Sequence, residues 1–359
     1  MSKDSLKNLT PEQKRQLLAK LLQEKANKPQ NFPLSFAQKR LWFLDKLQPE
    51  SSAYNIPAAL HLTGELNFTC LQQSLNKIIQ RHEVLRSRFT IEKDEPIQQV
   101  FSKSSLQLDS QEKLRFPFID LQGLVKGEQD KQIKKLIKET SIQPFNLSDT
   151  PLFRVRLIKL NQNEHVLLFT MHHIISDYFS MRLLIRELAT IYQSLSKGET
   201  AQLPELPVQY GDYATWEQEW LKSEKRATQL EYWQKNLANY PPLLNLPTDY
   251  PRPPVQRFRG ARESFALTQD LSNALKNLSQ GQNSTLFMTL LTAFKILLYR
   301  YSNQEDILIG STITNRENRA EINNLIGLFV NNLIFRSNLS GNPSFTNFLQ
   351  QVREITLNA

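Results

Sequence analysis

Alternating apolar and charged positions predict two neighbouring strands in the first half of the chain. From 150 to 160, apolar residues alternate with arginines and a lysine, which is the period-two pattern of a half-buried strand. A continuous apolar run follows at 165–170, after the polar residues 161–164. Because only a short polar connection separates the two runs, we expect them to pair as a β-hairpin.

Apolar residues three and four positions apart predict amphipathic helices along the rest of the chain. The expected helices span 10–25, 36–46, 67–81, 180–195 and 285–301, and a last one begins at 344. Further strands are expected at 58–62, 264–267, 306–314 and 325–335. The proline-rich stretch 240–254 predicts an extended connection, since proline fixes its own φ and restrains the residue before it.

The order of these elements favours two α/β layered units. Strands and helices alternate on both sides of the proline-containing segment 204–207. The chain of 359 residues is also longer than the size at which one hydrophobic core usually stops growing. We therefore expect an N-terminal linker or docking helix in 1–28, an N-terminal lobe at 29–205 and a C-terminal lobe at 206–359.

Composition and charge narrow the class of protein. A hydrophobic content of 40% without low-complexity tracts argues against a disordered chain. The single cysteine, Cys70, excludes a disulfide framework within the chain. The net charge of +9 is dispersed, so we interpret it as a solvated surface, with an acidic partner or a phosphate-bearing substrate as the alternative. No nucleic-acid-binding motif accompanies the charge, and we expect no nucleic acid partner.

Membrane insertion and export are not expected either. No segment reaches the roughly 18 consecutive apolar residues that a membrane span needs. The first 25 residues are rich in charge and lack the apolar core of a signal peptide. The sequence therefore predicts a cytoplasmic protein.

The most informative segment for chemistry is 171–178, Met-His-His-Ile-Ile-Ser-Asp-Tyr, between the apolar run and an amphipathic helix. If the strand continues through the pair, His172 and His173 point to opposite faces, one toward a cleft and one toward the interior. Side chains on opposite faces cannot easily bind one metal ion, and no cysteine cluster or HExxH motif completes a set of ligands. The order of residues does not exclude a catalytic Ser–His–Asp triad, although the G-x-S-x-G motif that carries the nucleophilic serine in many hydrolases is absent. The sequence does not indicate a nucleotide cofactor, because it contains neither G-x-G-x-x-G nor the Gly-Lys-Ser/Thr phosphate-binding loop.

The same segment resembles the HHxxxDG motif of condensation domains of nonribosomal peptide synthetases, which are relatives of chloramphenicol acetyltransferase. Five further segments resemble motifs of this family, in the family's order, so the resemblance covers nearly the whole chain. They lie at 34–44, 81–89, 210–216, 309–316 and 326–332. The first two are most similar to the subtype that accepts an L-configured donor residue.

The resemblance implies an α/β (α+β layered) fold of two chloramphenicol acetyltransferase-like lobes in a V around a central tunnel. It also implies the formation of an amide (peptide) bond between carrier-tethered substrates, in which an acceptor α-amine attacks a donor thioester. The expected partners are an upstream and a downstream peptidyl carrier protein, with an adenylation domain downstream if the gene continues. If Met1 is the native start, the donor arrives on another chain. No cofactor or metal would bind directly, because the phosphopantetheine arm belongs to the carriers.

The resemblance assigns roles to several residues of the motifs. The expected catalytic residue is His173, which would orient the amine and stabilise the tetrahedral state, with proton removal as a secondary role. His172 is expected to be structural and to face inward. Asp177 is expected to pair with Arg316 and to support the fold.

Five other residues are carried over with less defined roles. Arg40 and Arg86 belong to the first two matching segments and are interpreted as support for the site or as scaffold charges. Tyr178, Ser311 and Asn331 are candidates for lining the tunnel.

Two departures from the family pattern leave alternatives open. Tyr178 replaces the glycine of the motif, and it would either narrow the channel for the donor arm or point outward. The closing His-Gln-Asp-Leu-Pro-Phe-like run is absent, so the second lobe is expected to be truncated at its C-terminus. A non-catalytic module that binds carrier proteins is therefore one alternative function. An epimerase-like relative is another, although the first two matching segments argue against it.

Overall fold

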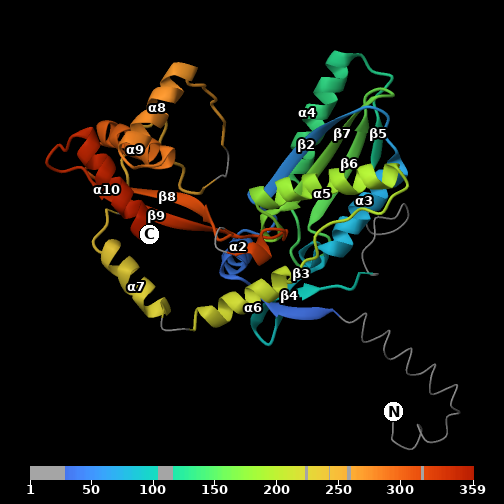
Figure 1. Cartoon of the computed structure of the whole chain (residues 1–359), viewed down its shortest axis with the longest axis horizontal. Helices are drawn as coiled ribbons and strands as arrows, with labels where there is room; N and C mark the ends of the chain where they lie inside the picture. The colour runs from blue at the N-terminus through green and yellow to red at the C-terminus, as the bar shows by residue number, and fades with distance from the viewer. Residues whose placement is uncertain (1–28, 104–115, 223–224, 242, 257–259, 317–318) are drawn as a thin grey trace, which may run out of the picture. The chain divides into compact units, whose positions relative to one another are not determined.

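The computed structural model describes residues 29–103, 116–222, 225–241, 243–256, 260–316 and 319–359 (Figure 1). The chain divides into two compact units. The first contains the described residues up to Lys222 together with Asn315–Phe329, and the second contains Ser223–Thr314 and Val330–Ala359. The helix expected at 10–25 lies outside the described residues.

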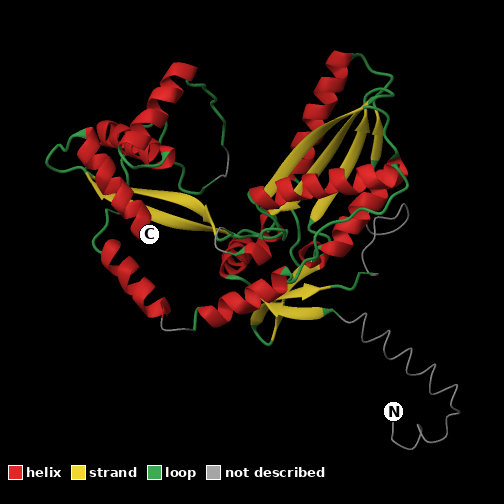
Figure 2. Ribbon diagram, in the orientation of Figure 1, coloured by secondary structure: helices red, strands yellow, loops and turns green. Residues whose placement is uncertain are grey.

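The main sheet of the first unit has four strands in the order β2-β7-β6-β5 (Figure 2). These strands are β2 (Asn55–Thr63), β5 (Phe118–Asp120), β6 (Phe153–Lys159) and β7 (Glu164–His172). β6 and β7 pair antiparallel as the expected hairpin, β2 is antiparallel to β7, and β5 is parallel to β6. The central strand β7 is buried along nearly its whole length, which explains why its sequence is continuously apolar.

Helices cover both faces of this sheet. Val166 and Leu168 of β7 pack in one apolar cluster with Ile133 and Leu136 of α4 (Lys126–Ile142). Figure 1 shows α5 (Tyr178–Ser196) crossing the other face, and α5 packs against α3 (Phe68–Arg81). The apolar stripes of α3 and α5 that the sequence predicts are buried.

A smaller antiparallel sheet completes the first unit, with β1 (Gln30–Pro33), β4 (Glu95–Val100) and β3 (Ser87–Glu92) in that order. Two helices accompany it, α2 (Phe36–Leu47) and α6 (Tyr210–Trp220), and α6 packs on β1. Ser35 caps α2 in a capping box with Gln38, since the Ser35 side chain accepts from the Gln38 backbone and the Gln38 side chain accepts from Ser35. A turn of 3-10 helix, η1 (Glu83–Arg86), joins α3 to β3.

The second unit is built on the antiparallel pair β8 (Asp306–Thr314) and β9 (Val330–Asn338). Its helices are α7 (Lys225–Asn236), α8 (Gln269–Gly281), α9 (Leu286–Ser302) and α10 (Phe345–Asn358). Residues of α9, α10 and both strands form one apolar cluster around Ile307, Phe335 and Phe348. None of the described helices is long and apolar enough to cross a membrane.

One expected strand is absent and another begins later than expected. Residues 264–267 form no strand, and Phe265 is 86% exposed, so this short segment lacks the burial that stabilises a strand. The strand expected from 325 begins only at Val330. Residues 325–329 are apolar because they are buried in the first unit, and burial without a partner strand produces the same sequence pattern.

The compact units also differ from the lobes expected at 29–205 and 206–359. The first unit takes in α6 and the segment Asn315–Phe329, which the sequence assigns to the C-terminal lobe. The reason is burial: Tyr210 of α6 and Phe329 are each 1% exposed, and their rings lie in contact at a centroid distance of 5.0 Å.

Candidate active site

The histidine pair lies where β7 ends. His172 is the last residue of the strand, and its backbone N–H donates to Leu152 of the neighbouring strand region at 2.9 Å. His173 opens a turn of 3-10 helix, η2 (His173–Ile175), and its N–H donates to the Tyr54 carbonyl at 2.8 Å. The turn is followed at once by α5, so a buried strand on one side and a helix on the other fix its position.

His172 is buried next to two aromatic rings. The ring is 3% exposed and lies within 6.4 Å of the Tyr54 ring and 6.1 Å of the Phe145 ring, measured between centroids. Its Nδ1 accepts the N–H of Ile174 at 3.1 Å. Burial, together with the neighbouring charge of His173, lowers the pKa of His172 to about 3. The ring is therefore neutral near pH 7 and caps the turn.

His173 has the opposite surroundings, because its side chain is half-buried and reaches solvent. Its Nδ1 lies 2.7 Å from the carbonyl oxygen of Ser176. Since a carbonyl oxygen can only accept, Nδ1 must carry a proton and donate it. In the neutral ring, Nε2 then holds the free lone pair. This nitrogen can accept a hydrogen bond or a proton from a ligand.

Asp177 is buried and its carboxylate is used within the first unit. Oδ1 accepts the backbone N–H of Ser180 at 2.7 Å, which caps the N-terminus of α5. Oδ2 accepts the N–H of Phe329 at 3.0 Å. The expected ion pair with Arg316 is present, with 3.5 Å between the guanidinium nitrogen and Oδ1. Asp177 therefore joins the segment Asn315–Phe329 to the start of α5.

Arg316 and Ser180 complete this buried cluster. Arg316 donates to the Ile322 carbonyl at 2.7 Å and to Ser180 Oγ at 2.9 Å, and its guanidinium stacks over the Phe329 ring at 4.0 Å. Burial lowers the pKa of Arg316, and the Asp177 carboxylate opposes this shift. Ser180 Oγ also accepts from the Gly327 N–H at 3.0 Å and donates to the Gly327 carbonyl at 2.8 Å. Ser180 was missed by sequence reasoning, since its partners lie far along the chain.

Tyr210 is a second residue whose role the sequence did not reveal, although it lies in a matching segment. Its hydroxyl donates to the Leu328 carbonyl at 2.7 Å and hydrogen-bonds Ser35 Oγ at 2.9 Å. Gly327 is required beside it, because a Cβ there would lie 2.0 Å from the Tyr210 ring. Through its hydroxyl and its ring, Tyr210 of α6 contacts Leu328 and Gly327 of the segment Asn315–Phe329.

Two arginines of the matching segments lie elsewhere in the first unit. Arg86 is buried and donates to the carbonyls of Ile79, at 3.1 Å, and Phe101. Its guanidinium lies 3.8 Å from the Glu83 carboxylate. Arg40 is half-buried on α2. The roles of Arg40 and Arg86 stay predictions.

The candidate tunnel residues divide between the units. Tyr178 is the first residue of α5 and is 78% exposed. Ser311 and Asn331 are half-buried on β8 and β9 of the second unit. Their placement beside His173 stays a prediction.

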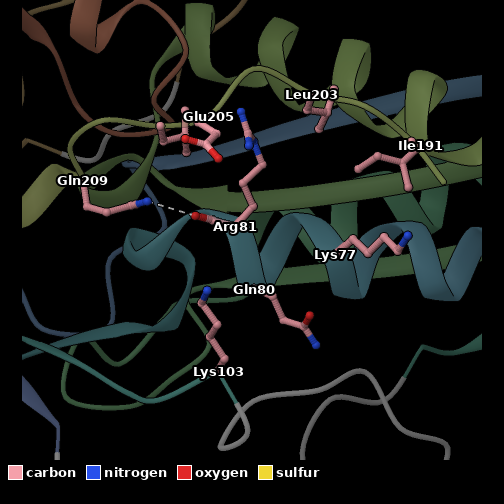
Figure 3. Close-up of a pocket in the computed structure, with 10 residues that line it drawn as sticks. Lys77, Gln80, Arg81, Lys103, Ile191, Leu203, Glu205 and Gln209 are labelled. Carbon is pink, nitrogen blue, oxygen red and sulfur yellow. Dashed lines mark hydrogen bonds between the residues drawn. The ribbon is translucent and has the colours of Figure 1, made fainter. Parts of the chain in front are cut away.

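A groove of about 480 Å³ on the first unit is not part of this site (Figure 3). It lies between α3, α5 and residues 201–209, and Lys77, Arg81 and Lys103 line it. Glu205 also lines it, and Arg81 is paired with Glu187 at 3.2 Å, so carboxylates offset much of its positive charge. Across the described ranges, no three His, Cys, Asp or Glu side chains gather as metal ligands.

The family model for the condensation domain matches residues 28–359. The chain belongs to the condensation domain family. This confirms the resemblance drawn from the motifs, and the fold is of the expected α/β class.

Similar proteins include large synthetases. The chain is 45% identical over 327 residues to one protein of the linear gramicidin synthase of Brevibacillus parabrevis, covering 91% of the chain and 4% of that protein. It is 38% identical over 334 residues to surfactin synthase subunit 1 of Bacillus subtilis (strain 168), covering 93% of the chain and 9% of that protein. The chain thus spans a small part of these relatives.

Solved structures share the fold. The X-domain from teicoplanin biosynthesis matches with a TM-score of 0.80 and 26% identity, covering 92% of this chain and 71% of that one. The first condensation domain of the calcium-dependent antibiotic synthetase, in complex with a substrate analogue, matches with a TM-score of 0.75 and 19% identity, covering 91% and 73%.

Proposed function

We propose that this condensation domain forms a peptide bond between two carrier-tethered substrates. The α-amine of an acceptor aminoacyl thioester attacks the carbonyl carbon of a donor thioester. A C–N bond forms, the C–S bond breaks, and the thiol of the donor arm leaves. Membership of the family and the identity to parts of peptide synthetases support this assignment.

The observation that carries the proposal is the hydrogen bond from His173 Nδ1 to the Ser176 carbonyl, 2.7 Å long. In the neutral ring it leaves the lone pair on Nε2, and the His173 side chain is half-buried. We infer that Nε2 accepts a hydrogen bond from the N–H of the attacking amine and orients its lone pair toward the thioester carbon. As the C–N bond forms, Nε2 can take the proton that the nitrogen loses.

Orientation is the larger part of this role. A free α-amine has a pKa of about 7.7–8.0, so roughly a tenth of it is already neutral near pH 7. A positioned base adds about 10²–10⁴-fold, while correct orientation of two reactants can lower the barrier by about 7–11 kcal/mol. We therefore assign proton removal as the secondary role of His173.

The partners follow from the reaction. Peptidyl carrier proteins upstream and downstream would present the substrates on phosphopantetheine arms, which are part of the substrates and not a cofactor of this chain. An adenylation domain would load the acceptor carrier. The tunnel, its lining by Ser311 and Asn331, and a cytoplasmic location stay predictions.

The test uses the chain with two carrier proteins, one loaded with an L-aminoacyl donor and one with an aminoacyl acceptor, across a panel of residues. Mass spectrometry then detects the dipeptidyl thioester on the acceptor carrier. We expect His173→Ala to lower product formation by about 10²-fold or more. His61→Ala is the control, since His61 is an exposed histidine on β2 of the same unit. Undiminished product with His173→Ala would refute the assignment.

A second candidate is a module that recruits proteins without chemistry. A solved structure of the X-domain from teicoplanin biosynthesis, which shares this fold, is a complex with OxyB. Tyr178 in place of the motif glycine also favours this alternative. Binding of loaded carriers by the wild-type chain, with no product for any substrate of the panel, would support recruitment over condensation.

A further inference from the structure

The side-chain amide of Gln38, which is buried, hydrogen-bonds the backbone of the turn that contains His173. The side chain of Gln38 is fully buried, and its Nε2 donates to the Ile174 carbonyl at 3.2 Å. Ile174 is itself fully buried, so this oxygen is removed from bulk solvent. A buried carbonyl without a donor is unfavourable, and the bond from Gln38 satisfies this oxygen.

The orientation of the Gln38 amide follows from its neighbours. Its Oε1 accepts the backbone N–H of Ser35 at 3.1 Å, and this donor requires an oxygen. The nitrogen must then face Ile174, whose carbonyl requires a donor. Only one of the two flips of the amide satisfies both groups.

A second amide supports the first. Gln38 Nε2 also lies 3.3 Å from Oε1 of Gln98, which is fully buried on β4. Gln98 Nε2 donates to Ser87 Oγ at 2.8 Å. A chain of neutral hydrogen bonds thus runs from the smaller sheet through Gln38 to the turn. Its members carry no net charge, so it needs no counter-ion in the interior.

We propose that Gln38 is a positioning residue for His173. The bond to Ile174 fixes the turn within which His173 Nδ1 meets the Ser176 carbonyl. That meeting sets the tautomer and leaves Nε2 with the lone pair. The inference rests on the proposed function for its effect on catalysis, but its effect on the ring stands apart from any activity.

The test is the tautomer of His173 in the full chain with ¹⁵N-labelled histidine, followed by long-range ¹H–¹⁵N correlation. His173→Ala assigns the signal among the chain's 5 histidines. In the wild type we expect the proton of the neutral ring on Nδ1. Gln38→Met removes all hydrogen bonds of the amide, and Gln38→Glu keeps the acceptor for Ser35 but loses the donor for Ile174. Both variants should move the proton partly to Nε2, the form that a free imidazole favours.

Activity provides a second readout where the wild type makes product. Displacement of the ring by about 1 Å should lower kcat by about 10–100-fold with a smaller change in KM. Gln129→Met is the matched control, because Gln129 Nε2 donates to the carbonyls of Leu121 and Leu160 in the same unit, where β7 begins, whereas His173 follows its last residue. It should lower stability without moving the His173 tautomer.

The outcomes separate the two proposals. An unchanged tautomer in folded Gln38→Met and Gln38→Glu would overturn the positioning role. A shifted tautomer together with full activity of His173→Ala would support the positioning role and refute the proposed function. If neither Gln38 variant folds, Gln98→Met decides, since it keeps the Ile174 bond but removes the support of Gln38. We expect a smaller tautomer shift from it, and no shift would overturn the inference.

Discussion

At the scale of single residues, burial assigns different chemistry to identical neighbours. His172 and His173 are adjacent, yet burial holds one neutral and the other reaches solvent with a fixed proton. Alternation along a strand predicts that two such side chains diverge. It does not predict which nitrogen of His173 is protonated, because the Ser176 carbonyl that decides it belongs to a turn and not to the strand.

Lys295 shows the same effect in the second unit. It lies fully buried in the apolar helix α9 and donates to the Phe335 carbonyl at 2.9 Å. Burial lowers the pKa of Lys295 to about 7, and the Asp306 carboxylate opposes the shift. Between this value and the ordinary pKa of about 10.4, the unfolded chain binds a proton that the folded chain does not. The contribution of Lys295 to stability therefore rises with pH across this window and is constant below it.

We expect Lys295→Met to remove that rise. Urea denaturation of the wild type and the variant at pH 7 and pH 10 gives the free energy of unfolding at each pH. The difference between wild type and variant should shift in favour of the wild type as the pH increases. A difference independent of pH would show that Lys295 titrates normally in the folded chain.

At the scale of elements, several buried polar contacts fix the N-terminus of α5 next to the histidine pair. Asp177 caps the helix and, through its second oxygen, also binds Phe329. Removing one partner of a buried ion pair leaves the other uncompensated. Because the same carboxylate makes the helix cap and the ion pair with Arg316, losing Asp177 removes both stabilising interactions together.

We expect Asp177→Ala to lower the free energy of unfolding by about 3–5 kcal/mol, since it removes the carboxylate paired with the buried Arg316. Asp177→Asn should cost less, because asparagine still caps a helix. Ser344→Ala is a control for capping alone: Ser344 caps α10 at 3.2 Å, and its loss should cost about 0.5–2 kcal/mol. Urea denaturation followed by tryptophan fluorescence measures all three. Equal costs for Asp177→Ala and Ser344→Ala would contradict a role for the ion pair.

Sequence reasoning predicted most elements that have a periodic apolar pattern. β8 spans 306–314 as expected, and α3, α5 and α9 lie within two residues of their expected bounds. It did not predict α4 or α8, and it placed the start of β9 too early because residues 325–329 are buried by contacts distant in the chain. The same limit applies to the site: the motif names His173 and Asp177, whereas Ser180 and Gln38 are defined by partners that no local pattern shows.

At the scale of the whole molecule, the first unit is discontinuous in sequence. Residues 315–329 leave β8 and return to β9, but they belong to the first unit, where Arg316, Ile322 and most of 325–329 are buried. Asp177, Ser180 and Tyr210 bind this segment through its backbone. The anchoring of the segment therefore depends on a few buried polar side chains.

We expect Tyr210→Phe to loosen the segment. The variant leaves the Leu328 carbonyl without its donor, which should lower the free energy of unfolding by about 1–3 kcal/mol. Amide hydrogen exchange over 322–329 should accelerate. Tyr192→Phe is the control, because Tyr192 accepts from the exposed Asn67 N–H and water can replace that bond. Equal exchange in the two variants would argue against the anchor.

The discontinuity has a consequence for synthesis on the ribosome. The core around Asp177 cannot close until Phe329 has been translated, long after Lys222 has left the peptidyl transferase centre. At roughly 5–20 residues per second, the nascent first unit waits about 5–20 s with Asp177 lacking its later partners. Over that interval the emerging polypeptide is exposed to chaperones and proteases, and slower translation between these two points would lengthen the exposure.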